Sequence, residues 1–187
     1  MTTIAKHALR ITAAAAIALS ASAAFAENPM VGGAAMYETK NIVENAVNSA
    51  DHKTLVAAVQ AAGLVDTLQG EGPFTVFAPT DEAFAALPEG TVETLLKPEN
   101  KDQLTKILTC HVVAADAMSD AIMKMVDDDN GAHPVNTVGG CVWTAKYEGD
   151  KIMIEDENGN VANVTIADVD QSNGVIHVID SVLLPKM

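Results

Sequence analysis

The chain has 187 residues, the length of one domain or of two small ones. Acidic residues outnumber basic ones by 25 to 11, which gives a formal net charge of −14 at pH 7. Without residues 1–26, which we expect to be a leader, no arginine remains and the net charge is −16. Nucleic acid is therefore not an expected partner, because its binding depends on cationic side chains that neutralise phosphates. A hydrophobic fraction of 49% is enough for a folded core and argues against wholesale disorder.

Residues 1–26 have the pattern of a secretory signal peptide. The segment begins with two basic side chains, continues with a short apolar stretch at residues 11–19 and ends with Ala-Phe-Ala. A transmembrane anchor is the alternative, but it needs about 20 consecutive apolar residues. We expect cleavage near Ala26 and a mature protein, not inserted in a membrane, in the periplasm or outside the cell.

The composition of residues 27–37 predicts a short flexible lead-in, followed by a single domain over residues 38–187. The first helix should begin after Asn41, because Glu44 lies three positions on, as in a capping box. The next helix should end at Gly63, a residue that adopts the left-handed conformation common after helices.

A buried strand is expected at residues 74–78, and Thr80 is a good N-cap for the short helix after it. We expect further helices with Thr91 as a cap, after Pro98, and around residues 117–125.

After Gly131 the apolar period is two as far as the C-terminus, as at residues 141–147, which is typical of strands with one buried face. Asn158-Gly159 and Asn173-Gly174 both predict hairpin turns with positive φ values. The first turn precedes an expected strand at 161–169, and the second separates that strand from another at 175–184. Helices followed by hairpins indicate an α+β fold with an antiparallel sheet.

The two cysteines, Cys110 and Cys141, favour a disulfide, because an even number of cysteines in an exported chain is typically paired. The alternative is a reactive Cys110 thiol activated by His111. Neighbours on a strand point to opposite faces, so the alternative has poor geometry if both residues lie on a strand.

The acidic runs at 127–131 and 155–159 superficially resemble calcium loops. Aligning the glycine of each run with position 6 of an EF-hand places Val126 or Ile154 at position 1, where a carboxylate is required. The sequence therefore predicts no metal site, and calcium dependence has only the charge in its favour. It also predicts no cofactor and no catalytic residue, since no nucleophile elbow or phosphate-binding loop is present.

Two long segments resemble the signature blocks of the fasciclin domain family. They are residues 75–84, TVFAPTDEAF, and residues 173–185, NGVIHVIDSVLLP. Residues 55–68 also fit the early helices of that family. Between the blocks, residues 108–113 (LTCHVV) stand where the family usually carries a Tyr-His pair, and Cys110 replaces the Tyr. We therefore transfer only His111, as a packing or hydrogen-bonding position.

The resemblance covers residues 38–187 and is to bacterial single-domain secreted members. It implies a wedge-shaped antiparallel β-sandwich flanked by short helices. It further implies non-enzymatic cell adhesion through a cell-surface or matrix protein or glycan, or through a second copy of the chain. The alternative function is binding of a small apolar ligand by a periplasmic or extracellular protein with a stress- or symbiosis-related role.

Overall fold

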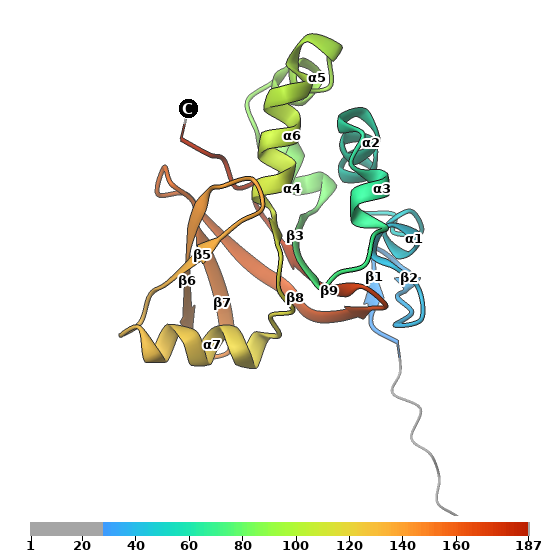
Figure 1. Ribbon diagram of the computed structural model, residues 1–187. Coiled ribbons are helices and arrows are strands. Elements are labelled where there is room, and N and C mark those ends of the chain that lie inside the picture. The colour runs from blue at the N-terminus through green and yellow to red at the C-terminus, as the bar shows by residue number, and fades with distance from the viewer. Residues whose placement is uncertain (1–27, 187) are drawn as a thin grey trace, which may run out of the picture.

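A computed structural model describes residues 28–186, so the predicted leader at 1–26 lies outside the described residues. The helices are α1 (Ile42–Ala46), α2 (Lys53–Ala62), α3 (Val65–Leu68), α4 (Asp81–Ala85), α5 (Thr91–Leu95), the 3₁₀ helix η1 (Pro98–Asn100), α6 (Lys101–Cys110) and α7 (Ser119–Asp128). The strands are β1 (Met30–Val31), β2 (Ala34–Ala35), β3 (Phe74–Pro79), β4 (Val112–Val113), β5 (His133–Asn136), β6 (Val142–Glu148), β7 (Lys151–Glu155), β8 (Val161–Gln171) and β9 (Gly174–Ile179). In Figure 1, α1 to α6 gather on one side of the strands and α7 lies below them.

The segment at residues 28–37, expected to be a flexible lead-in, instead folds against the domain. Strands β1 and β2 form a tight antiparallel hairpin. Val31 and Met36 are only 4% and 2% exposed, so this segment contributes two side chains to the core. The sequence did not predict this packing, because a segment rich in glycine and alanine has the composition of a linker. Nothing in the sequence shows that Val31 and Met36 are buried.

The predicted caps are confirmed at α1, α2 and α4. Asn41 and Glu44 form the predicted capping box at α1, and Gly63 ends α2 with a φ of 74°. Thr80 accepts a hydrogen bond from the amide of Ala83 at the start of α4. At α5 the prediction was wrong, because Gly90, with a φ of 79°, is the N-cap and Thr91 is already inside the helix.

Helix α7 begins two residues later than predicted, and a distant residue explains the shift. Both backbone groups of Ala117 are hydrogen-bonded: the amide donates to Thr75 Oγ1, and the carbonyl accepts from Nε2 of His177. The carboxylate of Asp168 then accepts from the Ser119 amide at 2.6 Å. Asp168 therefore caps α7 from the sheet, and residues 117–118 are held outside the helix.

Within the described part of the chain, the main sheet has seven strands in the order β4-β3-β9-β8-β7-β6-β5. The predicted α+β class is confirmed, and most neighbouring strands are antiparallel. The pair formed by β3 and β9, second and third in this order, is the exception: these strands run parallel, with six register pairs from Phe74↔Gly174 to Pro79↔Ile179. The two signature-like blocks therefore lie side by side (Figure 1).

Strand β8 connects the two halves of the sheet. It pairs with β7 over residues 161–163 and with β9 over residues 164–171, with register shifts on the β9 side. The predicted last strand is shorter than expected, because β9 ends at Ile179 and the chain turns where Asp180 binds Asn163. Both predicted hairpins form, but in each Asn-Gly pair only the glycine has a positive φ; Gly174 already belongs to β9, and the β8–β9 loop is Ser172-Asn173.

The buried side chains form two hydrophobic clusters, one on each side of the β3–β9 pair. One cluster packs α1 to α6 against the sheet and includes Val76, Ala78, Ile176 and Val178. The other lies between α7 and the β5–β8 half and is centred on Trp143, which is 0% exposed. Alternation along a strand explains the division, since successive side chains of β3 and β9 enter opposite clusters.

Asn173 joins three segments that are far apart in the sequence. Its side-chain oxygen accepts a hydrogen bond from the Ile42 amide at the start of α1. Its amide nitrogen donates to the carbonyls of Leu68, the last residue of α3, and of Gly70, just after that helix. The asparagine is thus a fastening point between the β8–β9 turn and the first helices.

We predict that Asn173→Ala lowers the free energy of unfolding by about 2–3 kcal/mol, because three half-buried backbone groups lose their partner together. Urea denaturation measures the change. Asn48→Ala is the matched control, since Asn48 is exposed and donates only to the Glu44 carbonyl. Equal effects of the two substitutions would contradict the fastening role of Asn173.

Candidate functional site

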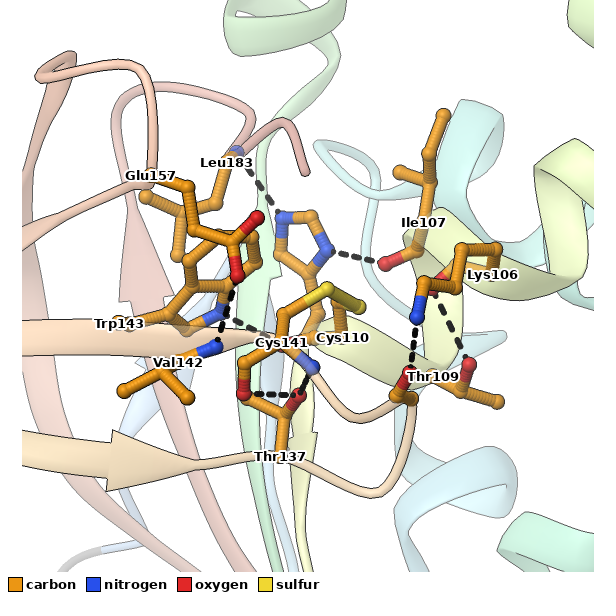
Figure 2. The surroundings of a disulfide bond; sticks show 12 residues. Lys106, Ile107, Thr109, Cys110, Thr137, Cys141, Val142, Trp143, Glu157 and Leu183 are labelled. Carbon is orange, nitrogen blue, oxygen red and sulfur yellow. Dashed lines mark hydrogen bonds between the residues drawn. A yellow bond between two sulfur atoms is a disulfide. The ribbon is translucent and has the colours of Figure 1, made fainter. Parts of the chain in front are cut away.

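A disulfide links Cys110, the last residue of α6, to Cys141, just before β6 (Figure 2). The Cα atoms are 5.5 Å apart, and both residues are buried. The bond closes a loop with a sequence separation of 31 and ties the helical side of the domain to the β5–β8 half. Neither cysteine is free, so the structure offers no thiol for the alternative of a reactive Cys110.

The loop before Cys141 is closely fitted to the disulfide. Thr137 Oγ1 bonds both backbone groups of Cys141, accepting from its amide and donating to its carbonyl. A Cβ atom at Gly139 would lie 2.6 Å from the Cys110 sulfur, so only glycine fits beside the bond. Trp143 donates its indole N–H to the Cys110 carbonyl at 2.6 Å, which anchors the end of α6 from the sheet (Figure 2).

His111 lies at the end of α6, not on a strand as expected, and both of its ring nitrogens are used inside the fold. Nδ1 is 2.9 Å from the Ile107 carbonyl, and Nε2 is 3.1 Å from the Leu183 amide. Because an amide can only donate, Nε2 accepts and Nδ1 carries the proton. The expected packing and hydrogen-bonding role of this position therefore agrees with the contacts, and His111 has no free nitrogen for catalysis.

His177 of β9, another buried histidine, also has both ring nitrogens hydrogen-bonded. Its Nδ1 accepts from the Asp168 amide at 3.3 Å, and its Nε2 donates to the Ala117 carbonyl at 2.8 Å. Its ring also stacks on Phe77, with centroids 5.7 Å apart. Neither ring nitrogen of His177 is therefore free to act as a general base.

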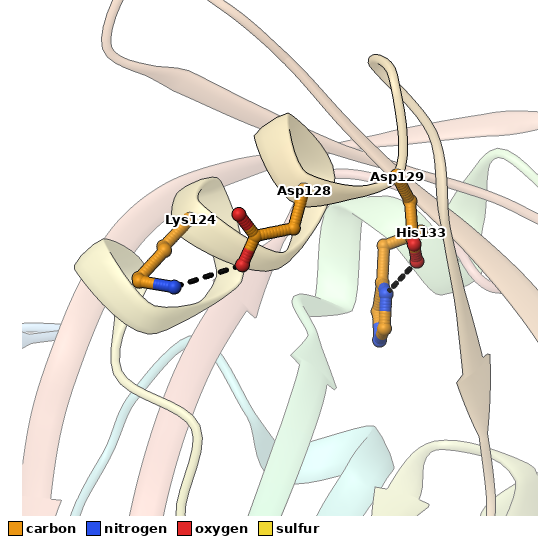
Figure 3. Close-up of polar contacts among 4 residues, drawn as sticks. All are labelled: Lys124, Asp128, Asp129 and His133. Carbon is orange, nitrogen blue, oxygen red and sulfur yellow. Dashed lines mark hydrogen bonds and ion pairs between the residues drawn. The ribbon is translucent and has the colours of Figure 1, made fainter.

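The carboxylates of the acidic run at the end of α7 have different partners. Asp128 pairs with Lys124 at 2.8 Å, and Asp129 binds His133 Nδ1 at 2.6 Å (Figure 3). Asp127 accepts from the Tyr147 hydroxyl at 2.5 Å. In the second run, Asp156 is engaged by the backbone of Asn158 and Leu184. No group of three or more His, Cys, Asp or Glu side chains within residues 28–186 is arranged to hold a metal ion.

An apolar cavity of about 90 Å³ lies between the first three helices and the β3–β9 side of the sheet. Its walls are mainly aliphatic side chains, and no charged residue lines it. Sequence reasoning missed this cavity and His52 at its wall, because hydrophobic periodicity shows which face is buried but not how completely the space is filled.

None of the helices within residues 28–186 combines the length and the apolar character that a membrane span requires.

Comparison with known proteins gives matches over most of the chain. The family model of the fasciclin domain matches residues 50–185. "Protein sll1483" of Synechocystis is 49% identical over 86% of this chain and 82% of its own length. "Cell surface glycolipoprotein MPB83" of Mycobacterium bovis is 34% identical over 86% of this chain and 68% of its own length.

Among solved structures, a fasciclin domain pair from the insect cell adhesion molecule fasciclin I matches with a TM-score of 0.69. The sequences are 20% identical, and the match covers 78% of this chain and 51% of the insect chain. The present chain therefore spans about half of that domain pair, and the likeness concerns the fold.

We predict that replacing both cysteines, Cys110→Ala with Cys141→Ala, lowers the free energy of unfolding by about 3.7 kcal/mol. The reason is the entropy that a closed loop removes from the unfolded chain. Urea denaturation of the oxidised protein and the double variant measures the loss. Equal stability of the two proteins would contradict a structural role for the bond.

The pH dependence of stability tests the burial of His111. Burial lowers its pKa from 6.5 to about 4, against smaller opposing effects of the Ile107 carbonyl and Asp156. The folded state thus binds fewer protons than the unfolded state between these values. The stabilisation that the neutral, buried His111 contributes to the folded state is therefore complete above pH 6.5 and is lost as the pH falls toward 4.

We predict that His111→Gln reduces the slope of unfolding free energy against pH in this interval by up to about 1.4 kcal/mol per pH unit. Urea titrations between pH 4.5 and 7.5 measure the slope for both proteins. A slope unchanged by the substitution would show that His111 titrates normally in the folded protein.

Proposed function

The chain belongs to the fasciclin domain family, and we propose that it is an exported, non-enzymatic module for cell adhesion. Its partner would be a cell-surface or matrix protein or glycan, or a second copy of the chain. Fasciclin-domain proteins are in general adhesion proteins rather than enzymes, one relative of this chain is a cell surface glycolipoprotein, and the insect structure comes from a cell adhesion molecule. The observation that carries the proposal is the family match, which spans nearly the whole of the proposed domain at 38–187.

Several observations support contact over catalysis as the mechanism. The cysteines are joined in a disulfide, and the ring nitrogens of His111 and His177 are hydrogen-bonded to backbone groups. A net charge of −16 after removal of the proposed leader favours partners with basic patches, glycans or contacts bridged by cations. Calcium dependence rests on this charge alone.

We place the contact surface on the outer face of β6, β7 and β8. The register sets Thr144 beside Glu155 and Glu155 beside Val161. Val142 lies two residues before Thr144, so it projects from the same face of β6. Val142 and Val161 are 45% and 43% exposed, which provides apolar area with a polar surround, as interaction surfaces have.

The test is attachment of cells to a surface coated with the purified mature protein, with and without calcium. We expect saturable attachment that soluble protein competes away. The double variant Val142→Lys with Val161→Lys should reduce attachment at least about fivefold, since buried apolar contacts at an interface centre are worth about 1 kcal/mol or more each. Calcium dependence would show that the acidic runs take part.

The matched control is Met30→Lys with Val47→Lys, which makes the same change of charge at exposed apolar residues elsewhere. It should attach cells as the wild type does. Equal loss in the two double variants would argue for a general charge effect and against the β6–β8 surface. No attachment above an inert coating would contradict direct adhesion.

The second candidate function, binding of a small apolar ligand, has one observation in its favour, the uncharged cavity beside α1 to α3. It does not exclude adhesion, because the cavity and the β6–β8 surface belong to different parts of the domain.

A further inference from the structure

The apolar cavity is enclosed by elements from both ends of the sequence. Its lining includes Leu55 and Val59 of α2, Val76 of β3, Ile176 of β9 and, from the N-terminal segment, Met36. These residues are buried, whereas Ala46, Val56 and Leu64 in the lining keep partial exposure. The cavity therefore opens between α1, α2 and α3, and its deep end lies against the sheet.

The polar groups of the lining are few, and His52 is the distinctive one. His111 also lines the cavity, but both of its nitrogens are bonded to the backbone. His52 is 3% exposed, and its Nδ1 is 2.8 Å from the Ser49 hydroxyl. Its Nε2 is the one buried side-chain polar atom of residues 28–186 without a hydrogen-bond partner.

The surroundings of His52 keep its ring neutral. Burial lowers its pKa, an effect that the nearby Ala78 carbonyl and the carboxylates of Asp51 and Asp81 oppose only in part. The Ala78 carbonyl is close to the ring but does not complete a hydrogen bond of acceptable geometry with Nε2. A polar atom that is buried without a hydrogen-bond partner is unfavourable, so a ligand that bonds Nε2 would be stabilised there.

We propose that this cavity binds a small uncharged molecule that is apolar along most of its length and carries one hydroxyl group. The apolar part occupies the space between α2 and the sheet, and the hydroxyl bonds His52 Nε2. A hydroxyl both donates and accepts, so it suits either tautomer of the ring. The absence of cationic side chains from the lining disfavours carboxylates and phosphates, which would lose their hydration without a counter-charge.

Three related probes test the proposal: p-cresol, toluene and p-toluate share one ring and differ only in the polar group. Titration of the full mature protein, followed by NMR of the backbone amides, measures binding. We expect p-cresol to shift the resonances of α1, α2 and β3, and toluene to bind about fivefold more weakly, the value of one net hydrogen bond. The carboxylate p-toluate should bind at least about tenfold more weakly than p-cresol.

Two substitutions locate the site. Ala46→Leu places a larger side chain at the entrance and should reduce p-cresol binding at least about tenfold. Ala57→Leu is its control, because Ala57 is an exposed residue of α2 outside the lining. His52→Leu should remove the preference for p-cresol over toluene while leaving toluene bound.

Failure of p-cresol to bind, or equal binding by the Ala46→Leu variant, would overturn the cavity as a ligand site. An unchanged preference in the His52→Leu variant would overturn the role of Nε2. The spectrum of each variant without ligand shows whether the fold is intact, so a folding defect is distinguished from a binding defect. Cell attachment is measured separately, so neither proposal depends on the other.

Discussion

The parallel pairing of β3 with β9 is the constraint on which the rest of the domain depends. It joins segments about one hundred positions apart in six consecutive register pairs. It begins at Gly174, where a Cβ atom would lie 1.9 Å from the Phe74 carbonyl oxygen, so only glycine allows the strands to approach there. Val76 and Val178 face the helical cluster, and Phe77 and Ile179 face the cluster around Trp143. Both cores are therefore built on the same two strands.

This pairing gives the two signature-like blocks of the sequence a physical explanation. Pro79 ends β3, Thr80 caps the following helix, and the carboxylate of Asp81 accepts from the Thr54 amide in α2. The second block supplies Asn173, whose side chain fastens the first helices, and His177, which holds the segment before α7. The residues that identify the family in this chain thus hold the scaffold together and leave its outer surfaces free for contact.

Local signals were sufficient to predict much of this fold. The capping box at Asn41, the left-handed Gly63 and the alternation around Trp143 each depend on residues within a few positions of one another. The parallel direction of β9 could not be predicted, because hairpin turns indicate only how neighbours in the chain pair. The start of α7 could not be predicted either, since its cap is Asp168, which lies 49 positions from Ser119.

Of the candidate sites, only the cysteine pair could be predicted from the sequence. The cysteine pair was visible from the number of cysteines and the expected compartment, whereas the position of His111 at a helix end required the structure. The cavity and the unpaired nitrogen of His52 arise where α1 to α3 meet the sheet without filling the space between them. Such incomplete packing is a property of many side chains together, and no local motif marks it.

The most direct test of this account is amide hydrogen exchange of the mature protein, resolved by residue. If the β3–β9 pair supports both cores, the amides of residues 76–78 and 176–178 exchange most slowly, through opening that costs the full free energy of unfolding. The edge strands β4 and β5 then exchange faster, through local opening. Faster exchange in the β3–β9 pair than in β6 and β7 would contradict the central place given to this pairing.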